Sequence, residues 1–147
     1  MINVATVRSN RRAVLAVFRQ LRQWGLCAEP KYADCLSCGV RSIHEAPSQR
    51  SIGYVFWHIQ DEDALWVTGE LYLAYGALSD DVEDSAIAKQ VVDALTATGL
   101  AVAWDGDPGS RILVRLNEPR SYRPKTRRSI RLLKADRAFL KRAGIKY

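Results

Sequence analysis

Two cysteines separated by two residues, Cys35 and Cys38, are the first residues in the chain whose spacing indicates chemistry. A Cys-x-x-Cys pair in a tight turn can place two thiolates on one tetrahedral zinc ion, and a closed site needs two further ligands. The candidates for these ligands are His58 and Asp61, with Cys27 and His44 as companions. The chain has no second Cys-x-x-Cys pair, so loop thiols and a core histidine are the alternative interpretation. Zinc is therefore the one cofactor that the sequence suggests.

A histidine close to carboxylates is the second group of residues that could do chemistry. His58 lies three residues before Asp61, and such a pair can transfer protons in general acid–base catalysis. This spacing predicts, as an alternative function, a small hydrolytic enzyme that depends on His58 and Asp61, with or without zinc. The chain has only two histidines and contains neither a Gly-x-Ser-x-Gly motif nor a phosphate-binding loop. We therefore assign no catalytic residue and favour a non-enzymatic function.

The third group is a run of cations near the C-terminus. Residues 118–147 hold eleven Lys and Arg against two acidic residues, whereas the preceding 117 residues hold eleven basic and fourteen acidic residues. Cations that neutralise phosphates release condensed counterions, which gives salt-sensitive binding to nucleic acid. An acidic protein surface could attract the same charges, and a solvated helix docked on the domain is the third interpretation. The residues that would make the contact are Arg120, Arg123, Lys125, Arg127, Arg128, Arg131, Lys134, Arg137, Lys141 and Arg142.

These features favour a binding or regulatory protein whose basic C-terminal segment contacts nucleic acid or an acidic protein surface. A small inhibitor or accessory protein of the phage or plasmid type is one form that such a protein could take. No apolar run reaches the ~18 residues of a membrane span, and the N-terminus shows no secretory signal, so no membrane partner is expected. An odd number of cysteines, three, adds to the expectation of a cytoplasmic protein with reduced thiols.

Apolar residues at helical spacing predict the helices that would position these groups. One helix is expected over about residues 10–24 and another over about residues 80–98. Their apolar stripes are Val14, Phe18, Leu21 and Trp24 in the first helix and Ile87, Val91 and Leu95 in the second. A third helix, over about residues 126–143, would carry most of the C-terminal cations.

Runs of aromatic and β-branched residues predict two antiparallel hairpins. In the first, residues 54–59 and 65–73 would pair around an acidic turn at 61–63. In the second, residues 100–104 would pair with residues 111–116 across a turn rich in Asp, Gly and Pro.

Together these elements predict an α+β domain over residues 1–117, followed by a basic linker and helix over residues 118–147. Its sheet would have four strands and be mainly antiparallel, with the first two helices on one face. Residues 27–51, which hold all three cysteines, are predicted as an irregular connection.

Three short motifs stand out beside these elements. They are a Cys-x-x-Cys-Gly loop at residues 35–39, an aromatic-His-x-Gln-Asp strand at residues 57–61 and a Trp-Asp-Gly turn at residues 104–106. With these motifs the chain resembles an uncharacterised bacterial family, a domain of unknown function, over about residues 12–116. The resemblance implies a domain of that extent and no activity, and the basic segment lies outside it.

Overall fold

The computed structural model describes residues 1–32 and 52–121, and these residues form three helices and five strands. The predicted basic helix over residues 126–143 and the two cysteines of the Cys-x-x-Cys pair lie outside the described residues. In chain order the elements are α1 (Val4–Gln23), β1 (Leu26–Glu29), β2 (Gly53–Phe56), α3 (Ile59–Thr68), β3 (Glu70–Ala77), α4 (Asp84–Ala97), β4 (Ala101–Ala103) and β5 (Ile112–Arg115).

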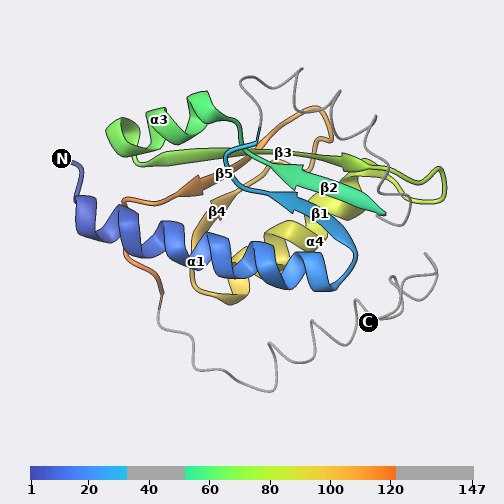
Figure 1. Cartoon of the computed structure of the whole chain (residues 1–147), viewed down its shortest axis with the longest axis horizontal. Helices are drawn as coiled ribbons and strands as arrows, with labels where there is room; N and C mark the ends of the chain where they lie inside the picture. The colour runs from blue at the N-terminus through green and yellow to red at the C-terminus, as the bar shows by residue number, and fades with distance from the viewer. Residues whose placement is uncertain (33–51, 122–147) are drawn as a thin grey trace.

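The five strands form one mixed sheet in the order β1-β2-β3-β5-β4 (Figure 1). β1 and β2 are parallel, with Leu26 opposite Gly53, and the other three pairings are antiparallel. The predicted α+β class is confirmed, but the predicted number of four strands is wrong. The additional strand, β1, lies at the start of the segment that we expected to be irregular. Its sequence, Leu-Cys-Ala-Glu, has little intrinsic β-propensity, so its pairing with β2 rather than a local signal makes it a strand.

The antiparallel pairing predicted for the first hairpin is confirmed, but its short acidic turn is wrong, because a helix connects the two strands. Residues 59–68 form α3, and β2 pairs with β3, where Tyr54 lies opposite Gly76. The helix begins because His58 and Asp61 form a capping box, in which each side chain accepts a hydrogen bond from the other residue's backbone N–H. It ends at Gly69, which adopts a left-handed conformation with φ 72°. The second predicted hairpin is confirmed as β4 and β5.

The main core lies between the sheet and the two helices α1 and α4, which cover the same face (Figure 1). Strand residues alternate between the faces. On β2 and just after it, Val55 and Trp57 join the main core, whereas Tyr54 and Phe56 belong to a smaller cluster on the opposite face. Trp57 packs edge-to-face against Phe18 of α1, with ring centroids 5.1 Å apart. Burial of each such large side chain stabilises the fold by about 1.5–3 kcal/mol.

Residues that follow β5 stay bound to the body of the domain. The Leu116 N–H donates to the carbonyl of Gly69 at 2.7 Å, and the Ser121 N–H donates to the carbonyl of Gly99 at 2.9 Å. The buried Asn10 side chain of α1 donates to the carbonyl of Leu116 at 2.8 Å. The chain therefore reaches the start of its basic segment beside α1 and the C-terminal end of α4.

Two glycines with the same backbone angle test this attachment. Gly99 and Gly106 both have φ +85°, but a Cβ at Gly99 would lie 2.2 Å from the Ser121 carbonyl oxygen, whereas one at Gly106 meets nothing within 4 Å. We expect Gly106→Ala to lower the free energy of unfolding by about 1–2 kcal/mol, the cost of a left-handed alanine. Gly99→Ala should cost about 1–3 kcal/mol more because of the added clash. Urea unfolding of both variants measures the difference, and equal losses would contradict the packing of Ser121 on Gly99.

Candidate functional site

The predicted His58 and Asp61 lie together at the N-terminus of α3. Nδ1 of His58 accepts a hydrogen bond from the Asp61 N–H at 3.1 Å, and Oδ2 of Asp61 accepts one from the His58 N–H at 3.3 Å. Both residues are buried, with 8% and 9% of their surface exposed. Because the N–H groups of a first helical turn have no partner within the helix, this arrangement satisfies two donors that burial would otherwise leave unpaired.

Arg111 neutralises the carboxylate of Asp61 from the neighbouring part of the sheet. Its two terminal nitrogens lie 2.5 Å from Oδ2 and 3.3 Å from Oδ1 of Asp61. The same guanidinium donates to the carbonyl of Tyr72 at 2.6 Å and lies over the Tyr72 ring, 5.7 Å from its centroid. Sequence reasoning did not identify Arg111, because fifty residues separate it from Asp61 and no local pattern connects them.

Both ring nitrogens of His58 lie close to Asp61, and Nδ1 forms a hydrogen bond with it. Nδ1 accepts from the backbone, so the proton is assigned to Nε2, which lies 3.1 Å from Oδ2 of Asp61. Burial lowers the pKa of His58 below its ordinary value of 6.5; Asp61 opposes this shift and Arg111 adds to it. The helix cap therefore occupies Nδ1, and the lowered pKa favours the neutral form of His58 at pH 7.

A second buried ion pair connects α3 to α1. Nε of Arg11 donates to both carboxylate oxygens of Glu62, at 2.8 and 3.1 Å, and its terminal NH2 group donates to Oε1. The Arg11 guanidinium also lies over the ring of Trp57, 5.9 Å from its centroid. Glu62 is 4% exposed, so this bidentate pair compensates the burial of its charge.

The predicted zinc ligands are only partly within the described residues. Cys35, Cys38 and His44 lie outside them, and Cys27 is half-buried on β1. Burial raises the pKa of Cys27, and Glu29 raises it further, so the thiol is protonated at neutral pH. In the part of the chain that the structure describes, no group of three His, Cys, Asp or Glu side chains could hold a metal ion. Zinc binding by Cys35 and Cys38 stays a prediction.

A row of arginines on α1 is a site that sequence reasoning missed. The helix holds five arginines and no acidic residue. Arg11 is bound to Glu62, and Nε of Arg22 donates to the carbonyl of Ala28 at 2.7 Å. The remaining three, Arg8, Arg12 and Arg19, are exposed and form no ion pair with any described residue. Their spacing of four and seven residues places them on one face of the helix, which we call the arginine row.

The start of α1 explains why this row was missed. The predicted first residue was about 10, but the helix begins at Val4, because Oδ1 of Asn3 caps it by accepting from the Thr6 N–H at 3.1 Å. Arg8 is therefore part of the helix. Residues 1–32 hold six basic and one acidic residue, whereas residues 52–117 hold three basic and eleven acidic ones. The net charge of the first 117 residues taken together hides this separation, whereas a separate count for each segment shows it.

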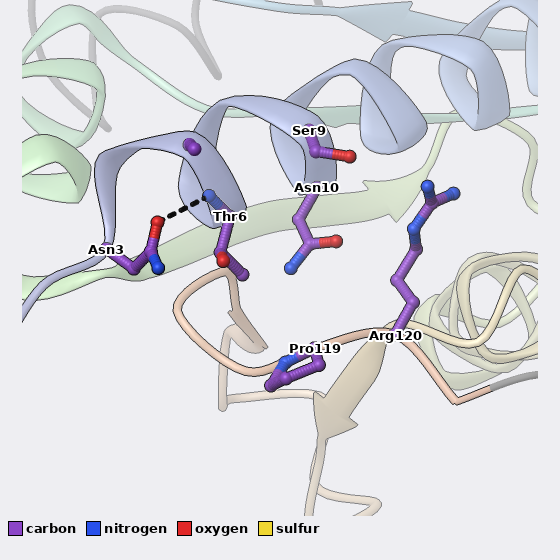
Figure 2. Close-up of a pocket in the computed structure, with 7 residues that line it drawn as sticks. Asn3, Thr6, Ser9, Asn10, Pro119 and Arg120 are labelled. Atoms are coloured by element: carbon purple, nitrogen blue, oxygen red, sulfur yellow. Dashed lines mark hydrogen bonds between the residues drawn. The ribbon is translucent and has the colours of Figure 1, made fainter.

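A pocket of about 450 Å³ lies on the flank of α1 (Figure 2). One wall comes from the first half of α1 and its cap, and the other comes from the segment after β5. The lining residues are Asn3, Ala5, Thr6, Ser9, Asn10, Pro119 and Arg120. Arg120 is the one described residue of the predicted C-terminal contact set, and it is exposed without an ion pair to any described residue. The pocket thus lies between the first half of α1 and the start of the basic segment.

Comparison with known families gives the extent of the domain. A family model described as a domain of unknown function (DUF6891) matches residues 10–120. The chain belongs to this family. The DUF6891 match begins within α1 and ends at Arg120, so it includes Asn10, Pro119 and Arg120 of the pocket, and the expected resemblance is confirmed at the level of the family. No curated protein and no solved structure matches the chain. None of the helices in residues 1–32 and 52–121 is long and apolar enough to cross a membrane.

The buried, neutral His58 predicts a pH dependence of stability. Because its pKa is lower in the folded state than its ordinary value of 6.5, the unfolded chain binds the proton more tightly. The free energy of unfolding should therefore fall as the pH drops below about 6.5. His58→Asn keeps an acceptor at the helix cap but cannot titrate, so it should lose part of this decline. Urea unfolding at pH 7.5 and 5.5 measures it, and equal declines in both proteins would contradict a buried neutral histidine.

Proposed function

We propose that this DUF6891 protein is a non-enzymatic binding protein that contacts nucleic acid through the arginine row of α1 and the basic C-terminal segment. The observation that carries the proposal is that Arg8, Arg12 and Arg19 are exposed on one helix face without an ion pair to any described residue. Arg120, at the start of the basic segment, lines a pocket beside the first half of α1.

The geometry of the arginine row suits a phosphate backbone. Arg8 and Arg19 are eleven residues apart, which corresponds to about 16 Å along a helix at 1.5 Å per residue. One strand of duplex DNA places a phosphate about every 3.4 Å along its axis, so the row spans several phosphates. Arginine presents a planar fork of N–H donors that matches phosphate oxygens. Because α1 packs on the sheet and is tied to α3 by Arg11, the row is held on a rigid element.

Nucleic acid is preferred to an acidic protein surface because of the amount of positive charge. Residues 118–147 add eleven cations to those of the row, and such density is typical of polyanion binding. The acidic residues of the chain gather instead in residues 52–117. This separation would orient the protein with α1 toward a negatively charged polymer. Binding to an acidic protein with no affinity for nucleic acid is the alternative result of the experiments below.

The alternative of a hydrolase that uses His58 and Asp61 has no comparable support among the described residues. Nδ1 of His58 accepts a hydrogen bond from the Asp61 N–H, and the carboxylate of Asp61 is bound to Arg111. These contacts stabilise the N-terminus of α3, and this role explains why His58 and Asp61 are buried.

The arginine row can be tested by neutralising its three members together. We expect Arg8→Gln/Arg12→Gln/Arg19→Gln to weaken binding of duplex DNA by about tenfold or more at 100 mM salt, because each lost phosphate contact removes counterion release. The slope of log affinity against log salt should become shallower by about 3. Fluorescence anisotropy over 50–300 mM salt measures both quantities.

The matched control for this variant removes three cations elsewhere on the body. Lys31, Lys89 and Arg115 are exposed and lie outside α1, so Lys31→Gln/Lys89→Gln/Arg115→Gln changes the net charge equally. It should leave the salt slope within about 1 of the parent value. Equal effects of the two triple variants would mean that net charge, and not the arginine row, determines binding. No salt-dependent binding of DNA or RNA by the parent protein would refute the proposal.

The contribution of the C-terminal segment is tested separately in the full-length chain. Arg127→Gln/Arg128→Gln/Arg131→Gln should lower the affinity for duplex DNA by about tenfold, as expected for three further phosphate contacts. The free energy of unfolding of the domain should stay within about 0.5 kcal/mol of the parent value, as for surface substitutions in general. Anisotropy and urea unfolding provide the two measurements. Unchanged affinity would restrict the contact to α1 and its surroundings.

A further inference from the structure

Asn10 presents an acceptor without a partner to the pocket beside α1. Its side chain is almost fully buried, at 2% exposed, and Nδ2 donates to the carbonyls of Leu116 and Glu118 at 2.8 and 2.7 Å. Because the amide oxygen cannot donate, these two bonds determine that Oδ1 is the free end. Among the described residues nothing donates to Oδ1, and Figure 2 shows it turned toward the side where Arg120 lies. A ligand that brings a donor into the pocket would complete the pairing of this buried group.

The other walls of the pocket supply a cation, hydroxyl groups and an apolar surface. The Arg120 guanidinium provides the positive charge, and the hydroxyls of Thr6 and Ser9 can donate or accept. The ring of Pro119 forms an apolar wall. The volume of about 450 Å³ lies within the range of roughly 300–1,000 Å³ that is typical of small-ligand pockets. A matching ligand has an anionic group, at least one N–H donor and a flat apolar face.

A nucleotide with an unpaired base has all three properties. Its phosphate is anionic, its base is flat, and the N–H donors of its Watson–Crick edge are free. In a duplex these donors are used in base pairing, and the bases are stacked inside the helix. We infer that the pocket binds one unpaired nucleotide of a single-stranded nucleic acid, with Asn10 contacting the base and Arg120 the phosphate. This inference rests on the proposed function and specifies its ligand as single-stranded nucleic acid.

The test uses the full-length protein with a single-stranded oligonucleotide, the duplex of the same length, and adenosine monophosphate. We expect the single strand to bind about fivefold more tightly than the duplex at 150 mM salt. Ser9 is an exposed helix residue, so Ser9→Leu should fold while its side chain occupies the pocket. It should weaken single-strand binding by about fivefold, the size of one net hydrogen bond, and change duplex binding by less than about twofold. Gln23→Leu places the same side chain at an exposed position near the other end of α1 and should change neither.

The outcomes distinguish the inference from the proposed function. Equal affinity for single strand and duplex, or equal effects of Ser9→Leu and Gln23→Leu, would overturn the inference and leave the arginine row as a general phosphate-binding surface. Binding of adenosine monophosphate that the single strand does not displace would also overturn it, because the ligand would then be a free nucleotide. If neither polymer binds in a salt-dependent manner, the proposed function fails and the inference fails with it.

Discussion

The connection between strands β2 and β3 depends on the contacts of the Asp61 carboxylate. It accepts from the His58 backbone and from Arg111, so one buried group both begins α3 and binds this helix to the start of β5. α3 connects β2 to β3. The residue at which this helix begins therefore determines where β3 can start and pair antiparallel with β2. A buried carboxylate is tolerated only with such partners, since removing one of them would leave a charge in a poorly solvated place. The His58 group is therefore best understood as part of the framework.

Charge is distributed over this framework in two parts, and the functional proposal follows from their separation. α1 carries cations without acidic residues, whereas residues 52–117 hold most of the acidic ones. Asn10 then brings the end of the domain back to α1 by binding the carbonyls of Leu116 and Glu118. As a result, the first half of α1, the pocket and the start of the basic segment lie together, although they come from segments far apart in the chain.

Much of the fold follows from local patterns that are visible in the sequence. The apolar stripe through Phe18 and Leu21 predicted α1, and Ile87 and Val91 predicted α4, since 3.6-residue periodicity directly reflects one buried face. The hairpin of β4 and β5 was equally predictable, because its turn is rich in residues that favour tight turns. For the site, the excess of C-terminal cations was visible as composition, while the capping pattern from His58 to Asp61 was visible but was interpreted as a strand end and a turn.

The sequence by itself thus determined the two periodic helices, the second hairpin and the excess of positive charge, because each depends on residues that are close in the chain. Only the tertiary structure decided that Leu26–Glu29 is a strand, that residues 59–68 are a helix, and that Arg111 binds Asp61. It also decided which arginines of α1 stay unpaired and where Asn10 points its oxygen. These features arise from pairings between residues about fifty to more than a hundred positions apart, or from a parallel strand partner, and no local spacing encodes them.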